Sequence, residues 1–84
     1  MLILCDFARL KTADAVYAYL QTELSLPPYF GRNLDALHDC LTDIGTPIRL
    51  VLTGTAGPCG QRFLGVLRDA ARRNKNLSLE IHEK

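Results

Sequence analysis

Several features that mark enzymes and disulfide-linked proteins are missing from this sequence. Its three cysteines, Cys5, Cys40 and Cys59, are an odd number without CxxC spacing, which favours reduced thiols over a disulfide frame or a zinc site. The chain has only two histidines and no GxSxG or HExxH signature, so no nucleophile, base and orienting group are placed together by a motif. We therefore expect a protein that is not an enzyme and that needs no cofactor.

Long apolar runs and an excess of one charge are missing too. No run approaches the roughly 20 apolar residues of a membrane span. The first ten residues, MLILCDFARL, lack both a basic lead and a small-residue cleavage site. These two absences lead us to expect a cytoplasmic protein without membrane contact. The formal net charge of +1 offers no broad attraction for phosphate, which argues against direct nucleic-acid binding.

The composition that remains is that of a small globular protein. The chain of 84 residues is long enough for one hydrophobic core, and because 48% of its residues are hydrophobic, nothing indicates disorder. We expect a single domain over residues 1–84.

Three segments have the hydrophobic pattern of strands. Residues 2–7 are almost continuously apolar, which predicts a strand covered on at least part of both faces. Residues 48–53 follow a Gly-Thr-Pro turn and predict a second strand. Residues 77–82 alternate apolar with polar side chains, which predicts a third strand with one covered face and one wet face.

Helical spacing separates these strands. One helix is predicted from residue 13, capped by Thr12, to about residue 25, and another from about 58 to 74. A third begins near Leu34, between the other two. Helix-containing connections favour parallel neighbouring strands joined by right-handed crossovers. We therefore expect an α/β fold with two layers, in which a three-stranded parallel sheet packs against about three to four helices.

The most informative stretch is residues 26–44, LPPYFGRNLDALHDCLTDI. Its adjacent prolines exclude a helix there, and Gly31 is able to take a positive φ. Asn33 can then accept hydrogen bonds from the first N–H groups of a helix that begins near Leu34. This stretch predicts a rigid turn that leads into a short helix.

That short helix has one apolar side and one acidic side. At about 100° per residue, one arc holds Leu34, Leu37, Cys40, Leu41 and Ile44, and the opposite side holds Asp35, Asp39 and Asp43. The aspartates repel one another by a few tenths of a kcal/mol per pair, so folding alone does not call for them. On spacing alone, the simplest interpretation is a solvated acidic face; a docking surface is the alternative.

Two other charged groups have simpler structural explanations. A divalent ion could use Asp35, His38 and Asp39, but one helix alone contributes them, so we expect no metal site. A basic cluster follows at residues 72–75. Cations near the end of a helix stabilise it, and no aromatic side chains are interleaved to stack bases, so we do not expect nucleic-acid binding there.

The turn and the acidic helix together resemble the signature of the barstar family, small intracellular inhibitors of secreted ribonucleases. The matching residues are Leu26, Pro27, Tyr29, Gly31, Asn33, Leu34, Asp35, Ala36, Leu37, Asp39, Cys40, Leu41 and Thr42. The resemblance implies an inhibitor of a secreted or toxin ribonuclease of the small basic, barnase-like type. Such an inhibitor occludes the cationic active site with an aspartate-bearing helix that mimics RNA phosphates. It would be a monomer when free.

The resemblance also implies roles for individual residues. Asp39 looks like the phosphate mimic, Asp35 like its companion, and Tyr29 like the aromatic that packs against a catalytic base. Asp69 matches an acidic helper on the later helix. The remaining expected contact residues are Phe30, Gly31, Asn33, Leu34, His38, Thr42 and Asp43. Family members can also carry a cis proline at the corner before the second strand, so Thr46–Pro47 is expected to be cis.

Some positions depart from the family pattern. His38 stands where the best-known member has a tryptophan, and Arg73 stands where it has a second acidic helper. The net charge of +1 also contrasts with a strongly acidic inhibitor. These departures leave the exact partner open, and the alternative is a barstar-fold interaction or immunity module for a partner that is not a ribonuclease.

Overall fold

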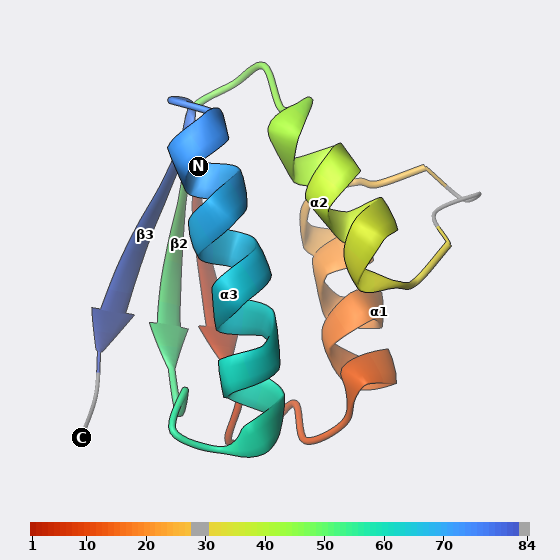
Figure 1. Ribbon diagram of the computed structural model, residues 1–84, viewed down its shortest axis with the longest axis vertical. Coiled ribbons are helices and arrows are strands. Elements are labelled where there is room, and N and C mark those ends of the chain that lie inside the picture. Colours follow the sequence, from red (N-terminus) through yellow and green to blue (C-terminus); the bar gives the residue numbers. More distant parts are fainter. Residues whose placement is uncertain (28–30, 83–84) are drawn as a thin grey trace.

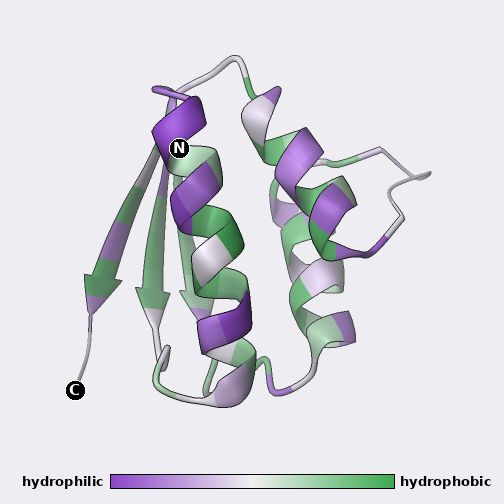
Figure 2. Cartoon of the chain, in the orientation of Figure 1, coloured by the Kyte–Doolittle hydropathy of each residue, from purple (hydrophilic) through white to green (hydrophobic). Residues whose placement is uncertain are grey.

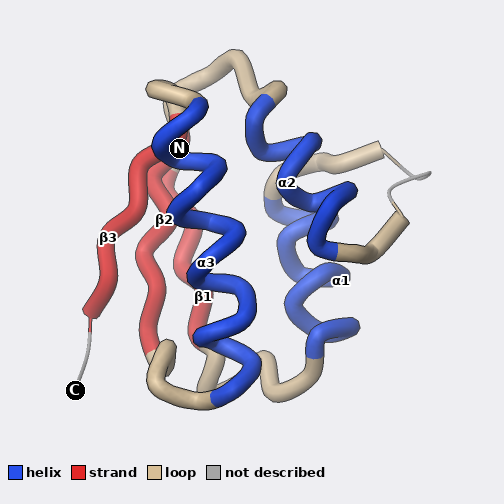
Figure 3. The backbone as a smooth tube through the Cα atoms, viewed as in Figure 1, coloured by secondary structure: helices blue, strands red, loops and turns tan. Residues whose placement is uncertain are grey.

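The computed structural model describes residues 1–27 and 31–82, which form one parallel sheet packed against helices (Figures 1 and 3). The elements in chain order are β1 (Leu2–Asp6), α1 (Ala13–Glu23), α2 (Leu34–Thr42), β2 (Ile48–Thr53), α3 (Pro58–Arg73) and β3 (Leu77–His82). The strand order is β1-β2-β3, and both neighbouring pairs are parallel. The expected two-layer α/β architecture is confirmed, with three helices in the described part of the chain.

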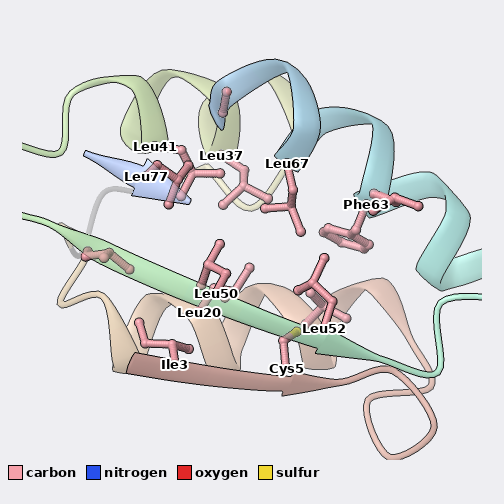
Figure 4. Packing of buried hydrophobic residues seen from close by; sticks show 14 of the residues in the cluster. Ile3, Cys5, Leu20, Leu37, Leu41, Leu50, Leu52, Phe63, Leu67 and Leu77 are labelled. Carbon is pink, nitrogen blue, oxygen red and sulfur yellow. The ribbon is translucent and has the colours of Figure 1, made fainter. Parts of the chain in front are cut away.

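The strand register places apolar side chains in rows on the face that the helices cover. Ile3 pairs with Leu50, and Cys5 pairs with Leu52. All four side chains are at most 1% exposed, and they meet residues from all three helices in one core (Figure 4). Alternate side chains of a strand point to opposite faces, so one face of the sheet carries the strands' contribution to this core.

No helix in the described part of the chain covers the other face of the sheet. Leu2 and Leu4 of β1 are each 60% exposed there. The expectation that β1 is covered on part of both faces is therefore wrong. The physical reason is topological: right-handed crossovers between parallel strands in the order β1-β2-β3 put all three helices on the same side. The alternation predicted for β3 is confirmed, since Leu77 is buried and Ser78 is exposed.

Aromatic side chains connect α1 to the rest of the core. Tyr17 is 7% exposed and meets Phe63 of α3 edge to face, with ring centroids 5.1 Å apart. The Tyr19 hydroxyl donates a hydrogen bond to the Leu4 carbonyl oxygen of β1. Tyr17 is therefore a core residue, and Tyr19 is partly buried and packs against the core.

Most element boundaries follow the sequence pattern closely. The Thr12 side chain caps α1 by accepting from the Ala15 N–H, as expected. The helix ends at Glu23 and not near Ser25, because Ser25 adopts a left-handed backbone conformation with φ of 52°. The α3 helix ends at Arg73, one position before the predicted end.

The expectation of a cis Thr46–Pro47 bond is wrong. No peptide bond between described residues is cis. The trans corner is held by its neighbours: the N-terminal ammonium group of Met1 donates to the Pro47 carbonyl oxygen at 3.1 Å, and the Ile48 N–H donates to the Asn76 carbonyl oxygen at 2.7 Å. Trans is also the usual state of an X–Pro bond in folded proteins.

The cysteines are free thiols, as predicted. Burial raises the pKa of the Cys5 thiol to about 12, which keeps this side chain protonated and unreactive. None of the helices in the described part of the chain is long and apolar enough to span a membrane.

Candidate protein-docking site

The N-terminal cap of α2 is built as the sequence suggested. Asn33 has an extended backbone, and its side-chain Oδ1 accepts a hydrogen bond of 2.8 Å from the Ala36 N–H. Its Nδ2 group donates back to the Gly31 carbonyl oxygen at 3.3 Å. Helix α2 therefore begins at Leu34, and the prediction of an asparagine cap is confirmed.

Two side chains fix this turn to α1, and neither was singled out from the sequence. Arg32 has a left-handed backbone with φ of 48°, and its guanidinium contacts Asp14 Oδ1 and Gln21 Oε1, each at 3.3 Å. Gln21 Nε2 also donates to the Pro27 carbonyl oxygen at 3.2 Å. These contacts hold both sides of the turn against α1, so the start of α2 has a defined position.

Helix α2 docks on its apolar side, as predicted. Leu37 and Leu41 are fully buried, and the partly buried residues that pack beside them include Leu34, Cys40 and Ile44. The opposite side of the helix is exposed. The side-chain hydroxyl of Thr42 stays local, donating to the Asp39 carbonyl oxygen at 2.9 Å.

The exposed side of α2 carries Asp35 and Asp39, and Asp43 follows at its C-terminal cap. We call these three residues the acidic face. None of their carboxylates makes a hydrogen bond or an ion pair with residues 1–27 or 31–82. Uncompensated carboxylates one helical turn apart are left to interact with solvent or with a ligand. Such a row can accept charge-assisted hydrogen bonds from a cationic partner.

His38 lies between the acidic face and α3. Its Nε2 atom is 2.6 Å from Asp69 Oδ2, and the two side chains are about a quarter to a third exposed, at 27% and 32%. Asp69 also accepts from Arg72 at 2.9 Å and from Arg73 at 3.0 Å. Hydrogen bonds from Arg73 and then from His38 lower the pKa of Asp69 to about 2. Asp69 is therefore a carboxylate whose charge is compensated within the molecule.

The C-terminal end of α2 is fixed by Asn74, which the sequence pattern predicted only as the end of the later helix. Asn74 is 7% exposed, and its Nδ2 group donates to the carbonyl oxygens of Leu41 and Ile44, both at 2.9 Å. These carbonyls belong to the last turn of α2 and its exit, where the helix itself supplies no donors. The position of this asparagine directly after a helix indicates a possible capping role, but its partners on α2 could not be predicted from the sequence.

The structure thus brings together most of the expected contact residues on one surface formed by α2, the turn before it and α3. Tyr29 and Phe30 lie outside the described residues. In the described part of the chain there is no group of three or more His, Cys, Asp or Glu side chains arranged to hold a metal ion.

Comparison with known proteins identifies the family. A family model described as "Barstar (barnase inhibitor)" matches residues 1–82. A Bacillus subtilis (strain 168) protein named "Putative ribonuclease inhibitor YrdF" is 41% identical to this chain over 51 residues. That match spans 60% of this chain but only 56% of the relative's length. The family model, in contrast, takes in both the acidic face and every strand and helix of the fold, and so the chain belongs to the barstar family.

Proposed function

We propose that this protein inhibits a secreted or toxin ribonuclease by occluding the enzyme's cationic active site with α2. The observation that carries this proposal is the acidic face itself. Asp35 and Asp39 are exposed on a helix that is held at both ends, and their carboxylates have no hydrogen-bonding or ion-pairing partner among the described residues. The family assignment and the name of the Bacillus subtilis relative support the same partner class.

The chemistry follows from what a ribonuclease must contain. An enzyme that cleaves RNA binds phosphate with arginine, lysine and histidine side chains, and a carboxylate can take the place of a phosphate oxygen in that cleft. Asp39, at the middle of the acidic face, would take the phosphate position, with Asp35 beside it. The inhibitor does no chemistry of its own; it excludes RNA by filling the site.

Preorganisation supports inhibition by a helix this short. Arg32 and Gln21 fix the turn before α2, and Asn74 fixes its exit. Ordering a loop or a side chain on binding costs free energy, and a surface that is already ordered in the free protein avoids this cost. Binding therefore costs little further ordering of the described backbone.

The proposed contact surface extends beyond the aspartates. Gly31, Asn33 and Leu34 form its rim at the start of α2, and Asp43 lies at the other end. His38, Thr42 and Asp69 form the side toward α3, and Tyr29 and Phe30 belong to the same stretch of sequence. The free inhibitor would be a monomer that acts in the cytoplasm, without cofactor, metal, nucleic acid or membrane.

The test is an inhibition titration against a small secreted guanyl-preferring ribonuclease. The wild-type protein should abolish cleavage of an RNA substrate at a 1:1 ratio of inhibitor to enzyme. A mononucleotide that occupies the enzyme's phosphate site should compete with the inhibitor for binding. Asp39→Ala should lose most of the inhibition. Glu80→Ala, which removes an exposed carboxylate from the open sheet face, is the matched control and should inhibit fully.

Two results would count against the proposal. Full inhibition by Asp39→Ala would exclude the phosphate-mimic mechanism. Lack of inhibition by the wild-type protein would favour the alternative, an interaction or immunity module for a partner that is not a ribonuclease.

A further inference from the structure

The surface beside the acidic face is basic, and this property narrows the kind of partner that fits. Helix α3 contains Arg62, Arg68, Arg72 and Arg73 but only one acidic residue, Asp69. Helix α2 contains aspartates and no lysine or arginine. The two helices lie side by side (Figure 1), and hydrophilic segments recur along both in the hydropathy view (Figure 2).

The single carboxylate of α3 does not offset these arginines at the surface. Asp69 Oδ2 contacts both His38 and Arg73, and Oδ1 accepts from Arg72. With these partners on both oxygens, Asp69 has little capacity left to accept from another protein. It holds Arg73 next to His38, at the boundary with α2, because both side chains contact the same oxygen. Arg72 lies on the other side of Asp69, where it lines a groove with Leu79 of β3. We call Arg72 and Arg73 the arginine edge.

The arginine edge keeps most of its own hydrogen-bonding capacity. Arg72 uses Nη2 toward Asp69, and Arg73 uses Nε. A guanidinium has five N–H donors in a planar fork, so several donors on each side chain stay directed to solvent. The side chains are 79% and 66% exposed, so an approaching protein can reach them.

The positions of the residues on the two helices put Arg73 within the proposed docking surface and Arg72 at its outer border. His38 bonds to Asp69 from one side, and Asp35 and Asp39 flank His38 on the other side of the same helix, 60° and 100° away at the usual ~100° per residue. The surface therefore changes from acidic to basic over the width of two adjacent helices. A partner whose cationic cleft continued uniformly under α3 would place like charges against the arginine edge, which is unfavourable.

We propose that the arginine edge is a specificity element, and that the partner is a ribonuclease whose phosphate-binding cleft is bordered by aspartate or glutamate side chains. The acidic face would enter the cleft while Arg72 and Arg73 form charge-assisted hydrogen bonds to the bordering carboxylates. This inference rests on the proposed function, since it assumes that α2 occupies the cleft. To the proposed function it adds that the partner's surface next to the cleft is acidic.

A pair of charge reversals tests this inference. Arg73→Glu changes the arginine edge, and Arg49→Glu is the matched control on the open face of the sheet. The two arginines are similarly exposed: the Arg73 side chain is 66% exposed and lies next to Asp69, and the Arg49 side chain is 64% exposed and lies next to Glu80. Each variant would be titrated against the small secreted guanyl-preferring ribonuclease that the wild-type protein inhibits, with thermal midpoints measured in parallel.

We expect Arg73→Glu to weaken inhibition by tenfold or more and Arg49→Glu to change it by less than twofold, with similar thermal midpoints. Unchanged or tighter inhibition by Arg73→Glu would overturn the inference, because the partner surface would then be neutral or basic there. An equal loss in both variants would also overturn it, since the effect would be one of net charge. Asp39→Ala, run beside them, separates the two failures: if it still abolishes inhibition, the proposed function stands without the arginine edge.

Discussion

His38 Nε2 lies 2.6 Å from Asp69 Oδ2, and this pair joins the middle of α2 to α3 across 31 positions of sequence. The contact fixes the lateral position of the helix that carries the acidic face. It also makes Asp69 the centre of a small charged cluster with Arg72 and Arg73. Because Asp69 accepts these hydrogen bonds as a carboxylate, the strength of this contact between α2 and α3 depends on the protonation state of Asp69.

That dependence predicts an acid transition in stability. The pKa of Asp69 is lowered from 3.8 to about 2, so its stabilising contribution is fully present above about pH 4 and is lost as the pH falls towards 2. Asp69→Asn should have a lower thermal midpoint than the wild-type protein at pH 6, and the difference should shrink between about pH 4 and 2. Thermal unfolding followed by circular dichroism at each pH measures this. Asp43→Asn, whose carboxylate has no ion pair with a described residue, should show a small difference that stays constant.

Asn74 is expected to matter more for stability than its place after a helix suggests. Asn74→Ala removes the donor to the Leu41 and Ile44 carbonyl oxygens, and an unsatisfied buried polar group costs about 1–3 kcal/mol. Asn76→Ala is the control, since Asn76 Nδ2 makes only a 3.3 Å contact to Ile44 and should cost less. Urea unfolding of both variants gives the comparison. Equal losses would show that Asn74 does not secure the end of α2.

Much of the architecture could be predicted because it depends on local patterns. The alternation in residues 77–82 and the helical spacing after Asn33 each involve neighbours within a few positions, and both predictions are confirmed. The exposure of Leu2 and Leu4 could not be predicted, because a continuous apolar run looks the same in an edge strand with one open face as in a buried strand.

The side-chain contacts that fix the two ends of α2 could not be predicted from the sequence, for a different reason. The contact from Asn74 to Leu41 spans 33 positions, and its existence depends on how α2 and α3 pack. The same is true of Arg32, whose partners lie on α1. Spacing within a single helix identified which aspartates face outward, but it could not reveal that Asp69 is engaged by its neighbours.

The aspartates of the acidic face should differ in their contributions to binding. Asp39→Ala should cost about 2–5 kcal/mol of binding free energy, because it removes a desolvated carboxylate and leaves cations of the partner unpaired. Asp35→Ala should cost less, and Asp43→Ala no more than about 1 kcal/mol, as is usual for an exposed pair at a rim. Inhibition constants for the three variants measure the order. A larger effect for Asp43 than for Asp39 would contradict the proposed centre of the contact.

All three of these variants should unfold at nearly the wild-type temperature. The carboxylates face away from the core and have no hydrogen-bonding or ion-pairing partner among residues 1–27 and 31–82, so their removal leaves nothing unsatisfied. A loss of inhibition together with a lower thermal midpoint would indicate damage to the fold and not loss of a contact.

The rate of association should fall as salt is added. The Debye length shortens from about 30 Å at 0.01 M to about 8 Å at 0.15 M ionic strength, which screens the attraction between the acidic face and a cationic cleft. The association rate should fall less steeply with ionic strength than that of a strongly acidic inhibitor, because the net charge here is +1 and the arginine edge lies beside the acidic face. Stopped-flow association at a series of sodium chloride concentrations gives this slope. Asp39→Ala should reduce it, whereas Glu80→Ala, on the open sheet face, should change it less. An association rate that does not respond to ionic strength would show that the acidic face does not steer the encounter.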